Sequence, residues 1–124
     1  MMSSPLVAVV DDDASVRRAL KRLLQSAELQ VLEYASATEF LETGIAADPD
    51  CVILDIHLGG MSGLELLSRL RELGYNLPVL IITAYDDTQA RQAAARGRCA
   101  AYLRKPLDAK VLLEEVAAAM KRAA

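Results

Sequence analysis

Six polar residues follow four short apolar runs of the sequence, and their side chains could bind a cation and accept a phosphoryl group. An acidic triplet follows Leu6–Val10, and an acid, a hydroxyl and an amine follow three later runs; the full set is Asp11, Asp12, Asp13, Asp55, Thr83 and Lys105. Carboxylates crowded at the ends of buried strands require a cation to offset their charge. Oxygen ligands with room for water favour Mg²⁺, with Mn²⁺ as an alternative ion. The acids therefore predict a divalent metal site.

Asp55 is the candidate nucleophile of this set. An ionised aspartate can attack phosphorus and form an aspartyl phosphate, and no other residue of the chain resembles a nucleophile with its base. A bound cation and Lys105 would stabilise the phosphoryl oxygens, and Thr83 would donate a hydrogen bond to one of them. Taken alone, Asp13 is better interpreted as a helix N-cap. His57, the only histidine, is better interpreted as a loop residue than as a metal ligand.

The elements that would position these residues alternate between apolar runs and amphipathic segments. Strands are predicted at Leu6–Val10, Gln30–Tyr34, Cys51–Leu54, Val79–Ile82 and Ala101–Leu103. Helices are predicted from Ser15 to Ala27, from Ser36 to Gly44, from Ser62 to Leu73, from Asp87 to Arg96, and from Pro106 onward with Asp108 as a cap. Five such units predict an α/β fold with a parallel sheet and helices on both faces. The carboxyl ends of its strands would form the site.

Length and charge narrow the class of protein. The 124 residues suit one domain spanning 1–124, and the net charge of −3 comes without a basic stripe, so we expect no nucleic-acid binding by this chain. No apolar run is long enough to span a bilayer. We therefore expect a cytoplasmic protein with no membrane role. The spacing of Cys51 and Cys99 argues against a zinc site or a disulfide framework.

Over nearly its whole length the chain resembles the receiver domains of two-component response regulators. The motifs that carry the resemblance are VVDDD at Val9–Asp13, ILDIHLGGMSGLEL at Ile53–Leu66, LIITA at Leu80–Ala84 and YLRKP at Tyr102–Pro106. Their style is most similar to FixJ-like receivers of the LuxR-type class. The resemblance implies a doubly wound, flavodoxin-like (CheY-like) (βα)5 fold with strand order 2-1-3-4-5.

The resemblance also implies roles for the acids. Asp55 would accept a phosphoryl group from a phosphohistidine on a sensor histidine kinase. Asp12 would bind Mg²⁺ directly and Asp11 largely through water, while Asp55 and the backbone carbonyl of His57 would complete the protein ligands. Lys105 matches the lysine that binds the phosphoryl group. The chain would catalyse only its own phosphorylation and dephosphorylation, as a signalling switch rather than a metabolic enzyme.

Thr83 and Tyr102 match the hydroxyl and the aromatic residue of the family's switch. In the family the aromatic side chain turns inward when the hydroxyl moves toward the phosphoryl group. The Lys105–Pro106 bond is cis in typical members, which aims the lysine into the site. The resulting change would appear on the surface built by the helix at 87–96, the strand at 101–103 and the last helix. That surface would control a downstream effector domain or protein, with transcription as the expected output, and would suit a homodimer.

The sequence departs from the family pattern at two turns. Gly59 stands where many members have proline, and Gly60 follows it, so we expect a more flexible loop after the acceptor. Arg98 stands where members usually have glycine, with Gly97 one place early. We therefore expect the turn before the last strand to be distorted.

His57 and Tyr85 occupy variable positions that flank the acceptor and the switch threonine. In the family these positions tune how fast phosphate is lost. Bulky side chains at both should hinder the attacking water, so we expect a long-lived phosphorylated form.

The sequence also bears on three rival functions. A degenerate receiver that acts only as an interaction module is disfavoured by the complete set of acids, threonine and lysine. A phosphatase with an aspartyl nucleophile usually carries a second Asp two residues later as general acid, and here that residue is His57. A nucleotide-binding domain would need a glycine-rich turn where this chain has three acids.

Overall fold

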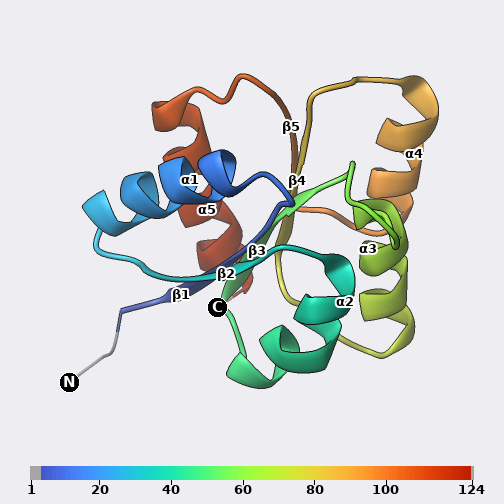
Figure 1. Cartoon of the computed structure of the whole chain (residues 1–124), viewed down its shortest axis with the longest axis horizontal. Coiled ribbons are helices and arrows are strands. Elements are labelled where there is room, and N and C mark those ends of the chain that lie inside the picture. Colours follow the sequence, from blue (N-terminus) through green and yellow to red (C-terminus); the bar gives the residue numbers. More distant parts are fainter. Residues whose placement is uncertain (1–3, 124) are drawn as a thin grey trace.

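Five parallel strands form the central sheet of the computed structural model, which describes residues 4–123 (Figure 1). The strands are β1 (Leu6–Val10), β2 (Gln30–Tyr34), β3 (Cys51–Asp55), β4 (Val79–Thr83) and β5 (Ala101–Arg104). Their order across the sheet is β2-β1-β3-β4-β5, and all neighbouring pairs are parallel. The expected fold class and strand order are confirmed.

The burial of the strands follows their composition. Every residue of β3 and β4 is buried, as expected of apolar strands covered by helices on both faces. The edge strand β2 instead alternates between exposed and less exposed residues. On that strand Glu33 forms ion pairs with Arg17 at 3.5 Å and with Lys21 at 3.6 Å, so charged groups line this edge of the sheet.

Helices cover the two faces of the sheet. They are α1 (Ala14–Ser26), α2 (Ala37–Glu39), α3 (Gly63–Glu72), α4 (Thr88–Arg96) and α5 (Ala109–Ala123). Helices α1 and α5 lie on one face and α2, α3 and α4 on the other (Figure 1). Each face has its own apolar cluster: Leu20, Leu24, Leu112 and Val116 belong to the first, and Phe40, Leu66, Leu70 and Ala94 to the second. Within residues 4–123, no helix has the length and apolarity needed to cross a membrane.

Side-chain caps start all five helices. Asp13 accepts hydrogen bonds from the first turn of α1, and Ser36 and Ser62 cap α2 and α3 through the backbone N–H of the residue three positions on. Asp87 and Asp108 cap α4 and α5 in the same manner. The last helix begins at Ala109, so the predicted cap at Asp108 is confirmed and the prediction that Pro106 opens the helix was wrong.

The segment after Ser36 is less regular than predicted. Only three residues are α-helical, and a π-helical turn at Phe40–Gly44 and a 3₁₀ turn at Ile45–Ala47 follow. A Cβ atom at Gly44 would overlap the ring of Phe40, which is fully buried. The wide turn thus places the large ring of Phe40 in the core while the glycine leaves room for it.

The turn before β5 keeps the hydrogen bonds of a Schellman motif. The N–H of Cys99 donates to the carbonyl of Ala94 at 3.1 Å, and the N–H of Arg98 donates to Ala95 at 3.0 Å. Arg98 takes the left-handed backbone conformation (φ 56°) that glycine usually supplies. Gly97 has a negative φ. The expected distortion is therefore confined to the backbone strain at Arg98.

Glycine is needed at position 97 for packing rather than for backbone conformation. A Cβ atom there would overlap the side chain of Leu67 on α3. Its carbonyl also accepts a hydrogen bond from the Arg71 side chain at 2.8 Å, and the same guanidinium donates to Leu77 at 2.9 Å. The glycine therefore allows α3 and α4 to approach closely, and Arg71 ties the turn to α3.

Candidate functional site

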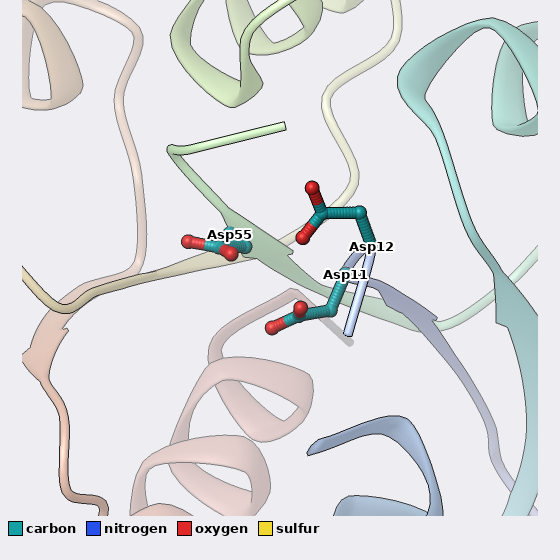
Figure 2. Close-up of side chains that lie close together, drawn as sticks. All are labelled: Asp11, Asp12 and Asp55. Atoms are coloured by element: carbon teal, nitrogen blue, oxygen red, sulfur yellow. The ribbon is translucent and has the colours of Figure 1, made fainter. Parts of the chain in front are cut away.

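Three carboxylates converge at the carboxyl ends of β1 and β3. Asp11 and Asp12 follow β1 and face Asp55 at the end of β3 (Figure 2). One oxygen from each lies within 4.8 Å of the others. Asp11 and Asp55 are buried, with 0% and 4% of their surface exposed, whereas Asp12 is exposed. Three carboxylate oxygens, one of them open to solvent, fit the ligand preference of Mg²⁺ for a few acids plus water.

Lys105 lies between the two buried acids. Its Nζ is 3.1 Å from Oδ2 of Asp11 and 3.4 Å from Oδ2 of Asp55. Burial opposes the charge of the ammonium, but the hydrogen bond to Asp11 and the attraction of Asp55 outweigh it, so the pKa of Lys105 is raised. The backbone N–H of Lys105 donates to the carbonyl of Thr83 at 2.8 Å, which anchors the start of its loop to β4.

The Asp55 carboxylate is only partly compensated. Burial and then the negative charge of Asp11 raise its pKa, and the N–H of His57, 3.2 Å from Oδ1, and Lys105 oppose that rise. A raised pKa means that the charged form still costs free energy in the folded chain. This carboxylate would therefore gain from a further positive charge.

Thr83 ends β4 and is fully buried. Its hydroxyl donates to the backbone carbonyl of Tyr85 at 2.7 Å and accepts from the N–H of Tyr85 at 3.1 Å. The Thr83 hydroxyl is thus bound to the loop after β4, and it forms no hydrogen bond with Asp55.

His57 and Tyr85 contact each other across the loops that follow β3 and β4. Their rings meet edge to face with centroids 5.3 Å apart. Tyr85 is 71% exposed and His57 is also exposed, so the pair lies at the surface rather than in the core. The sequence placed each residue beside the site but did not show that they touch.

Tyr102 lies half-buried on β5 and packs against the apolar cluster beneath α3 and α4. The guanidinium of Arg91 on α4 covers its ring, 4.7 Å from the ring centroid. Arg91 was not singled out from the sequence, because no local pattern links a helix residue to a strand eleven positions later.

The glycines and the proline near the site differ in backbone conformation and in their surroundings. Gly60 has a positive φ of 73°, which glycine adopts without strain, whereas Gly59 is exposed with open space around it. The Lys105–Pro106 peptide bond is cis, as the resemblance implied. Gly63, which was not predicted as a site residue, starts α3 so close to β3 that a Cβ atom would overlap the carbonyl of Asp55. The sequence feature that could have pointed to this close approach is a glycine directly after the N-cap Ser62.

Comparison with known proteins gives a consistent result. The family model for the response regulator receiver domain matches residues 7–117. The transcriptional regulatory protein FixJ of Azorhizobium caulinodans is 36% identical over 124 residues, covering 100% of this chain and 59% of that protein. This chain therefore spans less than two thirds of the length of that relative.

Solved structures agree with the sequence match. A CheY-like response regulator receiver domain protein from Methanospirillum hungatei superposes with a TM-score of 0.92 at 25% identity, covering 97% of this chain and 96% of the other. A response regulator receiver protein from Burkholderia phymatum is 43% identical, with a TM-score of 0.82 and coverage of 95% and 96%. With the strand order and the family match, these likenesses show that the chain belongs to the receiver domain family of two-component response regulators.

Proposed function

We propose that this chain accepts a phosphoryl group on Asp55 from the phosphohistidine of a sensor histidine kinase. The observation that carries the proposal is the convergence of Asp11, Asp12, Asp55 and Lys105 at one edge of the sheet. No metabolic reaction is proposed: the chain acts as a switch that catalyses only its own phosphorylation and dephosphorylation. Its assignment as one receiver domain over residues 1–124 stays a prediction.

The chemistry is a transfer between two nucleophiles. An ionised oxygen of Asp55 attacks phosphorus, a new P–O bond forms, and the P–N bond to the kinase histidine breaks. Mg²⁺, held by Asp11, Asp12, Asp55 and the backbone carbonyl of His57, would offset the charge of the phosphoryl oxygens. Lys105 already contacts Asp55 and would pair with one of those oxygens.

The same step would move the switch. A phosphoryl oxygen would compete with the Tyr85 backbone for the Thr83 hydroxyl, which now forms two hydrogen bonds there. Thr83 would turn toward Asp55, and Tyr102 would move into the space that it leaves. We propose that the surface of α4, β5 and α5 changes as a result.

The partners follow from that surface. We propose that it controls a downstream effector domain or protein, with transcription as the output, and that it forms a homodimer on phosphorylation. The support for a transcriptional output is that the FixJ relative, of which this chain spans 59%, is a transcriptional regulatory protein. A sensor kinase would present its phosphohistidine in the cytoplasm, so we place the chain there.

Intact mass measurement tests the acceptor. We expect the chain to gain one phosphoryl group when it is incubated with acetyl phosphate and Mg²⁺, and Asp55→Asn to gain none. Asp13→Asn is the matched control, because Asp13 caps α1 and lies outside the metal cluster. An adduct that persists in Asp55→Asn would refute the assignment of the acceptor.

A further inference from the structure

Three side chains form a linked cluster at the junction of α4 and β5. The guanidinium of Arg91 lies over the ring of Tyr102 at 4.7 Å, within the range of a cation–π interaction. The same guanidinium donates to the carboxylate of Asp86 through Nη2, at 2.6 Å from Oδ2. Asp86 lies in the loop between β4 and α4, which also contains Tyr85, so it holds the guanidinium from the side of that loop.

The hydroxyl of Tyr102 does not hold the ring in this position. It is buried and has no hydrogen-bond partner among residues 4–123. Burial raises the pKa of the phenol, and the negative charge of the nearby Asp86 carboxylate adds to the rise. Because a buried hydroxyl without a partner is unfavourable, other contacts must hold the ring in place. Those are apolar packing and Arg91.

We propose that Arg91 is a positioning residue that favours the unphosphorylated conformation by holding Tyr102 on the α4 side of β5. This role rests on the proposed function. There, Thr83 turns toward Asp55 and Tyr102 follows into the vacated space, so the contact between Arg91 and the ring is lost. A contact that exists in only one of two conformations favours that conformation by its own free energy. Loss of the contact shifts the equilibrium toward the phosphorylated conformation.

The expected effect is measurable with a phosphoryl mimic. Beryllofluoride with Mg²⁺ occupies the place of a phosphoryl group on an aspartate, so its affinity reports the cost of switching. We expect Arg91→Met, which keeps the apolar stem and loses the charge, to bind beryllofluoride about two- to fivefold more tightly than the native chain. Arg91→Lys keeps a cation and should stay near the native affinity.

The position of the ring gives a second readout. The chain has four tyrosines, so labelling with 3-fluorotyrosine gives a simple ¹⁹F spectrum in which Tyr102→Phe identifies the signal of Tyr102. In Arg91→Met without beryllofluoride, that signal should move part of the way toward its position in the bound native chain. Arg96→Met is the matched control, because Arg96 is exposed on the same helix, and it should change neither readout.

Several outcomes would overturn the proposal. An affinity in Arg91→Met equal to or weaker than the native value would do so. In a Tyr102→Ala background, we expect Arg91→Met to have no further effect on the affinity for beryllofluoride. If Arg91→Met still tightens binding there, the cause is a general loosening of α4 rather than the lost contact with Tyr102, and the proposal is wrong. If the native chain itself does not bind beryllofluoride, the proposed function fails and this inference fails with it. If the native chain binds and the variants match it, only this inference fails.

Discussion

Replacing Asp55 by asparagine should stabilise the metal-free chain and remove most of its response to Mg²⁺. The carboxylate is buried and lies in a cluster whose oxygens are within 4.8 Å of one another. Burial and the charge of Asp11 raise its pKa. Asparagine has nearly the same shape without the charge, and its Oδ1 can still accept the N–H of His57. The variant therefore relieves the repulsion without leaving a cavity.

The magnitude follows from the distances. Two unit charges 4.8 Å apart repel by about 3.5 kcal/mol at an effective dielectric constant of 20. The ammonium of Lys105, 3.4 Å from Asp55, attracts it by about 5 kcal/mol on the same scale, but that ammonium is shared with Asp11. The raised pKa shows that desolvation and repulsion together exceed the attraction. We expect asparagine to gain about 1–2 kcal/mol, or roughly 4 °C in Tm for each kcal/mol.

Thermal unfolding with EDTA and then with Mg²⁺ is the assay. Mg²⁺ at ten times its Kd should stabilise the native chain by about 1.4 kcal/mol, and Asp55→Asn by much less because a ligand is lost. Because the folded-state pKa of Asp55 is raised, the native chain loses stability as pH rises from the unfolded-state value of about 3.9 through the folded-state value. The difference in free energy of unfolding between Asp55→Asn and the native chain should therefore become smaller toward low pH. If the Asp55→Asn variant has a Tm in EDTA no higher than that of the native chain, the electrostatic argument is refuted.

Three further predictions concern the two rings beside the site, the turn before β5 and the start of α3. Trimming His57 and Tyr85 to alanine should shorten the half-life of the phosphorylated form severalfold, because their contacting rings hinder water, and an unchanged half-life by intact mass would contradict this. Arg98→Gly should raise the free energy of unfolding by about 0.5–1 kcal/mol in urea, because glycine adopts a positive φ without strain; a loss of stability would show that the arginine side chain matters more. Gly63→Ala should cost about 1–3 kcal/mol and slow phosphorylation, since α3 must move away from the Asp55 carbonyl; native stability would show that the loop yields easily.

The parts of the fold that could be predicted are those encoded locally. Continuous apolar runs mark β3 and β4 because both faces of these strands are buried. Ser36 and Ser62 start helices because a hydroxyl three residues before an acid can satisfy a free N–H. The site was predictable because parallel strands deliver the residues that follow them to one edge, so Asp55 and Lys105 meet although they are fifty residues apart.

The parts that could not be predicted depend on contacts between distant elements. The π-helical turn at Phe40–Gly44 brings Gly44 against the buried ring of Phe40, a close contact that the spacing of residues does not show. The place of glycine at 97 rather than 98 follows from the side chain of Leu67 on another helix. Likewise, the contact of Arg91 with Tyr102 depends on how α4 lies against β5.

The edges of the sheet limit how this chain can associate. At one edge, β5 is only four residues long, ends on Arg104 and is followed by Lys105 and by Pro106, which has no backbone N–H. At the other, Glu33 of β2 is held in ion pairs with α1. Short strands, charges and proline are the features that discourage strand addition from a second chain. These features disfavour the addition of a strand from a second chain at either edge of the sheet.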